Sequence, residues 1–266
     1  MLIDTHCHLT SPELLSRLDA VLASARAAGV ERMILVAVNQ ADAQAALNII
    51  GQHEGTFLVG GIHPHEAGKC GQDDISALRA LLLGEGAAAG LADRIVGIGE
   101  TGLDFFYDFA PPRRQEEVFR AQLEMASDLG RAVVIHARQS EVRVCEMLAD
   151  FPLLAGRVVF HCFSGDTAIA RRALDLGCCL SFTGVVTFKR SETIQASARY
   201  VPRDRIMLET DAPYLSPEPV RKIRPNEPAL LVHTARYLAD LRQENFEALA
   251  AFTTANAKRF FGLPEE

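Results

Sequence analysis

The segment MLIDTHCHLTSPELLSRLDAVLASARAAGVERMILVAV, residues 1–38, contains an apolar run, a helical pattern and a second apolar run. The helical pattern covers 11–29, with Ser11 at the N-cap position and Gly29 at its end, and both are common boundary residues of helices. The two flanking runs show little polar alternation, as is typical of strands that are buried on both faces. The segment therefore predicts a strand, a helix and a second strand of a parallel sheet.

The same alternation continues through the rest of the chain. Strand-like runs also occur at 56–65, 94–105, 131–138, 157–165, 179–185 and 205–215, and helical patterns at 111–130, 166–177 and about 227–261. Eight strands that alternate with helices, without a dividing linker, predict one domain, 1–266, of the α/β class with a (β/α)₈ TIM-barrel fold. An open doubly wound sheet is the alternative, but no G-x-G-x-x-G follows the first strand.

The composition limits the classes of function. The chain is 48% hydrophobic and 23% charged, which is typical of a globular protein, and its net charge is −7. A protein that wraps long duplex DNA by bulk attraction is expected to be basic, so any nucleic-acid role here requires a local site. No apolar run is long enough for a membrane span. Six cysteines without a CxxC pair or a signal peptide predict free thiols and a cytoplasmic protein.

Ionisable side chains recur at the carboxyl ends of the expected strands. Burying such a group in a core strand without a partner is costly, so their repetition at one end indicates a function. In a TIM barrel, the active site lies at this end of the strands. The residues concerned are His6, His8, His63, His65, Glu100, Asp104, His136, His161, Glu209 and Asp211.

Imidazole and carboxylate groups together suit zinc, manganese, iron or magnesium ions. The candidate ligands are His6, His8, Glu100, His136, His161 and Asp211. Six ligands are too many for one tetrahedral ion but suffice for two divalent ions that share a carboxylate, and the central strand position favours Glu100 as the shared ligand. Two such ions can hold a hydroxide between them, and the resulting positive local charge favours an anionic substrate.

The motifs MLIDTHCHL, GIHPH, GETGLDF, VIHAR, FHCFSG and LETDAPYL occur in this order, followed by RPNEP and ANAKRFFG. Together they closely resemble the TatD family of metal-dependent hydrolases, within the amidohydrolase superfamily, over essentially the whole chain. The resemblance implies a TIM barrel, a two-metal site and deoxyribonuclease or phosphodiesterase activity. It also implies one ion on His6, His8, Glu100 and Asp211, a second on Glu100, His136 and His161, and a role for Asp211 as the proton acceptor.

One motif departs from the family pattern. The family shows an RGKxNEP-like stretch after the eighth strand, whereas this chain reads VRKIRPNEP. Arg221, Lys222 and Arg224 keep its basic character in a shifted arrangement, which leaves their role in binding phosphate open.

Three further residues are candidates for substrate binding. His63 is expected to contact the substrate, with a role in shaping the turn at Pro64 as the alternative. Arg138 is expected to bind phosphate through two hydrogen bonds, and a salt bridge to Asp104 or Glu209 is the alternative. Glu209 is expected to hydrogen-bond the substrate or a nearby water.

The aromatic residues Phe105, Phe106 and Tyr107 follow the fourth strand. They are expected either to stack on a base or to pack against the mouth of the barrel.

The sequence thus predicts a two-metal hydrolase of DNA phosphodiester bonds that acts on ends or single strands. A metal-bridging hydroxide is expected to attack phosphorus, with Asp211 and Glu100 as the catalytic residues. An ester, lactone or amide hydrolase on the same site is the first alternative, and a non-catalytic, metal-stabilised binding module is the second. A PHP-type phosphoesterase is disfavoured because it is expected to have more histidines and seven strands. The expected assembly is a monomer or a weak oligomer.

Overall fold

Eight strands form one sheet in which their spatial order follows their order along the chain. The structure is a computed structural model that describes residues 1–265, and residue 266, the last of the expected domain, lies outside the described part. The pairs β1–β2, β3–β4, β4–β5, β5–β6 and β7–β8 are parallel. The strands are β1 (Leu2–Cys7), β2 (Val30–Ala37), β3 (Thr56–Gly60), β4 (Ile95–Asp104), β5 (Ala132–Arg138), β6 (Val158–Phe160), β7 (Cys179–Phe182) and β8 (Ile206–Leu208).

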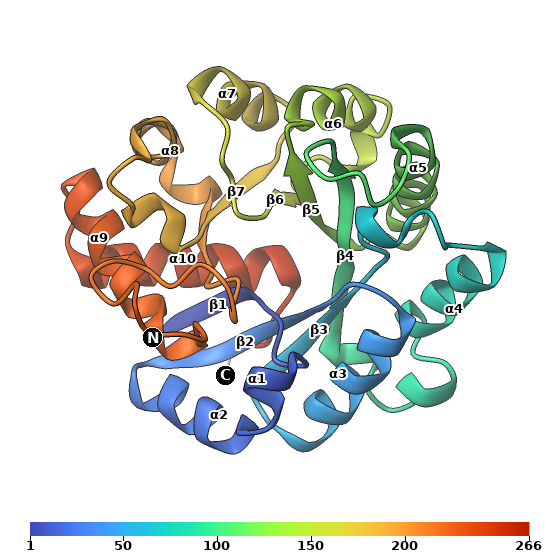
Figure 1. Ribbon diagram of the computed structural model, residues 1–266, viewed down its shortest axis with the longest axis horizontal. Coiled ribbons are helices and arrows are strands. Elements are labelled where there is room, and N and C mark those ends of the chain that lie inside the picture. Colours follow the sequence, from blue (N-terminus) through green and yellow to red (C-terminus); the bar gives the residue numbers. More distant parts are fainter. Residues whose placement is uncertain (266) are drawn as a thin grey trace. The chain divides into compact units, whose positions relative to one another are not determined.

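Helices follow every strand (Figure 1). They are α1 (Pro12–Leu15), α2 (Leu18–Ala27), α3 (Gln40–Gln52), α4 (Gln72–Leu82), α5 (Pro112–Leu129), α6 (Glu141–Leu148), α7 (Thr167–Asp175), α8 (Glu192–Tyr200), α9 (Leu231–Arg242) and α10 (Phe246–Phe261). Parallel strands in chain order with intervening helices constitute the (β/α)₈ or TIM-barrel fold, which confirms the predicted fold class. None of the described helices is long and apolar enough to cross a membrane.

Two compact units make up the chain. Among the described residues, the first contains 1–35, 161–171 and 179–265, and the second contains 36–160 and 172–178. Within the first unit, α10 packs against β1 and β8. Within the second, α3 packs against β3 and α5 against β4. These helices therefore pack against strands of their own unit.

Helix boundaries follow the capping residues where these are strong. Helix α5 has Pro112 at its start and ends at Gly130, which adopts the left-handed conformation with φ 61°. The expected single helix at 11–29 is wrong, because two helices, α1 and α2, occupy this segment. Arg17, at the break, forms an ion pair of 3.1 Å with Glu227, so the backbone turns where this side chain has a tertiary partner.

Strand β4 has a shift in its pairing register next to Glu100, a predicted metal ligand. All ten residues of β4 are buried, and its register against β5 shifts between Ile98 and Thr101. Gly99 lies in this bulge with φ 144°, and a Cβ atom there would lie 2.5 Å from the carbonyl oxygen of Val134. Only glycine fits such a close approach, and a bulge redirects the neighbouring side chain, here that of Glu100.

The six cysteines are free thiols, and five of them are buried. Burial raises the pKa of Cys7 well above its usual value and that of Cys162 to about 12. These two thiols, next to predicted metal ligands in the chain, therefore stay protonated at neutral pH and act as packing groups, as the sequence indicates.

Candidate metal centre

His6, His8 and Asp211 lie together in the first unit. The Nε2 atoms of His6 and His8 are 3.2 Å apart, and Oδ1 of Asp211 lies 3.7 Å and 3.4 Å from them, respectively. Burial alone would raise the pKa of Asp211, but the hydrogen bond with His8 and the nearby imidazoles lower it below its usual value. Two imidazole nitrogens and a carboxylate oxygen that face one another are a donor set for a divalent cation.

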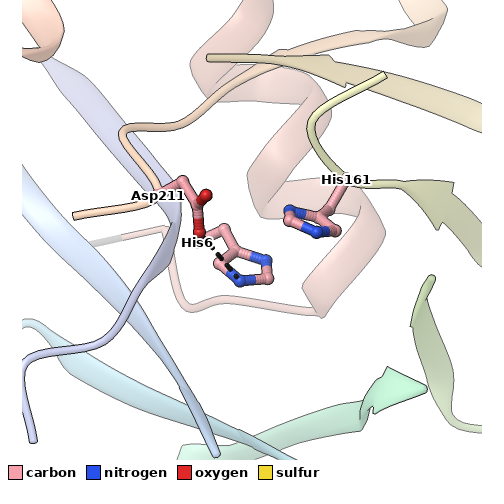
Figure 2. Close-up of side chains that lie close together, drawn as sticks. All are labelled: His6, His161 and Asp211. Atoms are coloured by element: carbon pink, nitrogen blue, oxygen red, sulfur yellow. Dashed lines mark ion pairs between the residues drawn. The ribbon is translucent and has the colours of Figure 1, made fainter. Parts of the chain in front are cut away.

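His161 extends this cluster. It follows β6, and its ring stacks on that of His6 with 4.0 Å between centroids and 18° between planes. One ligand atom from each of His6, His161 and Asp211 lies within 4.8 Å of the others (Figure 2). The three side chains come from β1, from the end of β6 and from the end of β8, so the fold brings together donors that are far apart in the sequence.

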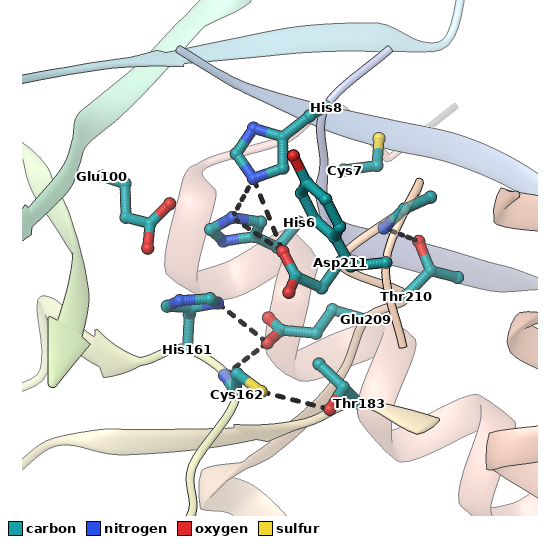
Figure 3. A network of polar contacts seen from close by, with 12 residues as sticks. His6, Cys7, His8, Glu100, His161, Cys162, Thr183, Glu209, Thr210 and Asp211 are labelled. Atoms are coloured by element: carbon teal, nitrogen blue, oxygen red, sulfur yellow. Dashed lines mark hydrogen bonds and ion pairs between the residues drawn. The ribbon is translucent and has the colours of Figure 1, made fainter. Parts of the chain in front are cut away.

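Glu209 contacts the imidazole ring of His161. The carboxylate is 1% exposed, and its Oε1 lies 3.4 Å from Nδ1 of His161 (Figure 3). It also accepts a hydrogen bond of 3.4 Å from the hydroxyl of Thr5 and one from the backbone N–H of Cys162. These contacts fix a buried carboxylate against His161, an arrangement in which a carboxylate orients an imidazole ring rather than facing a substrate.

Asp4 is a buried residue of this unit that sequence reasoning missed. It accepts hydrogen bonds from the backbone N–H of Thr210 at 2.9 Å, from the Thr210 hydroxyl at 2.5 Å and from the backbone N–H of His6 at 3.3 Å. Burial raises the pKa of Asp4 to about 7. Asp4 thereby joins β1 to the segment that carries Asp211. The available signal was its spacing of two residues from His6, which places both side chains on one face of a strand.

The second unit has its own cluster around Glu100, which is 3% exposed. Oε1 of Glu100 lies 2.8 Å from Nδ1 of His136 and 3.5 Å from Nε2 of His63. One ligand atom from each of these three residues lies within 4.8 Å of the others. Burial lowers the pKa of His63 to about 4, so that its ring is neutral at pH 7 and able to coordinate or to hydrogen-bond.

His63 also shapes the turn after β3. Its Nδ1 accepts a hydrogen bond of 3.1 Å from the backbone N–H of His65, at the start of a short 3₁₀ turn, Pro64–Glu66. The structure thus shows the turn role expected as the alternative for His63, and the contact with Glu100 uses the other nitrogen of the ring.

Asp104 contacts the ring nitrogen of His136 that faces away from Glu100. Its Oδ2 lies 3.0 Å from Nε2 of His136 and 2.9 Å from Nε2 of His65, and its Oδ1 accepts the backbone N–H groups of Phe106 and Tyr107. Burial alone would raise the pKa of Asp104, but the hydrogen bonds from His136, the Tyr107 N–H and His65 lower it well below its usual range. His136 thus lies between two carboxylates, one at each ring nitrogen.

The arginine candidates face aromatic rings. The guanidinium of Arg138 lies 4.2 Å from the ring centroid of Phe106 and 4.8 Å from that of Tyr107. Among the described ion pairs, none joins Arg138 to Asp104 or Glu209. In the first unit, the Arg221 guanidinium lies 3.8 Å from the ring centroid of Phe188.

The fold and these clusters define a TIM-barrel protein with the donor set of a metal-dependent hydrolase. Residues 3–262 match the TatD related DNase family, and the chain belongs to this TatD family of metal-dependent hydrolases.

Relatives and solved structures agree with this assignment. The metal-dependent hydrolase YabD of Bacillus subtilis is 34% identical over 99% of this chain and 100% of its own. The 3'-5' ssDNA/RNA exonuclease TatD of Cronobacter sakazakii is 36% identical, over 98% of this chain and 97% of its own. The crystal structure of YjjV, a TatD homolog from Escherichia coli K12, superposes with a TM-score of 0.91 at 27% identity and covers 99% of this chain and 98% of that one.

Proposed function

We propose that this protein is a two-metal nuclease that removes nucleotides from the 3' end of single-stranded DNA or RNA. The observation that carries the proposal is the pair of imidazole Nε2 atoms of His6 and His8, 3.2 Å apart and both facing Asp211. The polarity and the single-stranded substrate are supported by the 36% identical relative from Cronobacter sakazakii, whose name specifies both.

Two cations divide the ligands in this proposal. His6, His8, Glu100 and Asp211 hold one cation, and Glu100, His136 and His161 hold the other. Support comes from short distances, those of Asp211 to His6 and His8 in the first unit and that of Glu100 to His136 in the second. The TIM-barrel fold adds support, because its catalytic side chains lie at the carboxyl ends of the strands. The place of His161 in the second set rests on the resemblance to the family. Bound divalent cations supply Lewis-acid stabilisation of the phosphoryl oxygens and lower the pKa of water.

The chain's own residues supply the remaining roles. Asp211 accepts the proton of the attacking water, for which its lowered pKa keeps it ionised. Asp104 orients His136, and Glu209 orients His161 instead of binding the substrate. His63 and Arg138 contact the phosphate groups of the substrate strand.

Two properties of the whole chain fit this activity. A net charge of −7 limits attraction to a long duplex, so binding is expected to be weak and to fall steeply with salt. The six free thiols fit a reducing compartment such as the cytoplasm. We propose that the chain acts there as one catalytic domain.

The test starts from purified protein and elemental analysis of its bound metal. Chelated protein is then returned to Mn²⁺, Mg²⁺ or Zn²⁺ and assayed on oligonucleotides labelled at the 3' or the 5' end, as DNA, RNA and duplex, beside a panel of small esters, lactones and amides. We expect chelation to abolish cleavage, added metal to restore it, and single strands to be shortened from the 3' end. Cleavage of the small esters or amides alone would support the alternative hydrolase.

A variant of a proposed metal ligand distinguishes cleavage by this protein from cleavage by a contaminating nuclease. Glu100→Gln is expected to lower kcat by at least about 100-fold, because metal-ion stabilisation of a transition state is worth several kcal/mol. Glu124→Gln, an exposed residue of α5, is the matched control and should retain full activity. Wild-type activity in Glu100→Gln would contradict the proposed site.

A further inference from the structure

Four aromatic side chains are exposed in the loop that follows β4. Phe105, Phe106, Tyr107 and Phe109 are 36%, 51%, 41% and 63% exposed. The chain has only 14 phenylalanines and four tyrosines and no tryptophan, so this loop presents a large share of its aromatic residues to solvent. A contiguous exposed apolar patch of this kind marks a binding surface.

Three of these rings contact one another, and the side chain of Arg138 lies over two of them. Phe106 and Tyr107 contact each other edge to face with 4.7 Å between centroids, and Tyr107 and Phe109 lie 5.5 Å apart. The guanidinium of Arg138 lies over both Phe106 and Tyr107, at 4.2 Å and 4.8 Å. Arg138 is itself exposed. An exposed cation embedded among aromatic faces suits a ligand that is both anionic and aromatic.

The surface is fixed to the second cluster of the site. Asp104, whose Oδ2 lies 3.0 Å from Nε2 of His136, accepts the backbone N–H groups of Phe106 and Tyr107 at 2.9 Å and 3.0 Å. On the other side, the His65 ring lies 4.6 Å from Phe109 and 5.6 Å from Tyr107. The same carboxylate therefore contacts both a proposed metal ligand and the aromatic loop, which fixes the loop next to His136.

We propose that Phe106, Tyr107 and Arg138 form a stacking platform for the unpaired bases next to the scissile phosphate. This inference rests on the proposed nuclease function and specifies how that site selects its substrate. Side chains can stack only on a base whose face is free, so the platform favours single strands over duplex, and stacking tolerates any base sequence. The Arg138 guanidinium binds the phosphate between stacked bases.

The experiment combines the removal of one base from the substrate with the removal of one aromatic ring from the protein. Four 3'-labelled single-stranded oligonucleotides each carry a single abasic residue, at the first, second, third or fourth position from the 3' end. Wild type is expected to cleave the intact strand with a kcat/KM roughly 5- to 150-fold higher than the strand that is abasic at the stacked position, which is the range that corresponds to the loss of one stack between a base and an aromatic ring. In Phe106→Ala or Tyr107→Ala this preference for the intact strand should fall to within about two-fold.

Other variants show whether the aromatic ring itself is required. Phe106→Tyr and Tyr107→Phe keep a stacking face and should keep the preference. Tyr200→Ala removes an aromatic residue that is 42% exposed on α8 and should leave cleavage of both strands unchanged.

The outcomes separate the two proposals. If the alanine variants lower kcat/KM equally on intact and abasic strands, or if wild type shows no preference at any position, the platform is wrong while the nuclease stands. If metal-saturated wild type cleaves none of the oligonucleotides, the proposed function fails and the platform fails with it.

Discussion

Replacing Asp104 with asparagine tests whether this carboxylate orients His136 for the proposed metal site. Asp104 makes four contacts, two with backbone N–H groups through Oδ1 and two with imidazole Nε2 atoms through Oδ2. In Asp104→Asn, the amide oxygen can keep the two backbone hydrogen bonds. The amide NH₂ then takes the place of Oδ2, and it cannot accept a hydrogen bond from either ring.

The expected magnitude follows from the lost contact with His136. The 3.0 Å hydrogen bond between Nε2 of His136 and Oδ2 of Asp104 fixes the tautomer of the His136 ring. It also fixes the ring orientation, in which Nδ1 of His136 faces Glu100. Removing such a support costs about 10- to 100-fold in metal affinity or activity, or about 1.4 to 2.7 kcal/mol. Half-maximal activity in Asp104→Asn should therefore require about 10- to 100-fold more metal, while saturating metal restores much of kcat.

The assay is activity as a function of free Mn²⁺ concentration, with calorimetric titration of the chelated protein as the direct measure of affinity. Asp166→Asn is a matched control, because Asp166 also accepts two backbone N–H groups, those of Ala168 and Ile169, at the start of a helix. Metal titrations that coincide for Asp104→Asn and wild type would refute the orienting role. If Asp166→Asn raised the metal concentration for half-maximal activity by the same factor, the change in Asp104→Asn would result only from the loss of a negative charge.

Three other measurements follow from the structure. Glu116→Gln should destabilise the fold by about 0.5 to 1 kcal/mol at pH 7, since this partly exposed carboxylate forms a two-point pair with Arg143. The Arg143 hydrogen bonds lower the pKa of Glu116, so this contribution is fully present above the usual pKa of a glutamate and is lost as pH falls through the lowered pKa. Urea unfolding at pH 7 and at successively lower pH should therefore show the difference between variant and wild type shrink. Phe119→Ala, at a fully buried position, should cost about 3 to 5 kcal/mol in the same assay, whereas Leu153→Ala, 76% exposed, should cost almost nothing. Metal at 100 times its Kd should stabilise the chelated protein by about 2.7 kcal/mol, and a Tm unchanged by metal would contradict a cation site in the folded state.

The ionisable residues of the buried strands were easier to predict than the strand ends, since β6 and β8 end at Phe160 and Leu208, well before the predicted 165 and 215. His136 and Glu100 are visible in the sequence because they contradict the apolar pattern around them. The two-residue period of a strand predicted that His6 and His8 lie together, and their Nε2 atoms are 3.2 Å apart although β1 ends at Cys7. Pro112 and Gly130 likewise predict the boundaries of α5, because their preferred φ values suit a helix start and a helix end.

Other features depend on contacts between distant parts of the chain. The hydrogen bonds from Thr210 to Asp4 join residues 206 positions apart, and nothing local to either residue indicates them. The break between α1 and α2 lies at Arg17, whose partner, Glu227, belongs to a segment near the other end of the chain. The bulge at Glu100 required the register of β4 on β5, which a single strand's sequence does not contain.

The two clusters share one arrangement, in which a buried carboxylate contacts a ring nitrogen of a histidine. Asp104 does so for His136 and Glu209 for His161, and each carboxylate is 1% exposed and accepts backbone N–H groups from a loop that follows a strand. The loop and the histidine thus depend on the same carboxylate. An imidazole held in this way loses little rotational freedom when it binds a cation. In the proposed site, metal affinity therefore depends on the folded backbone as well as on the donor atoms.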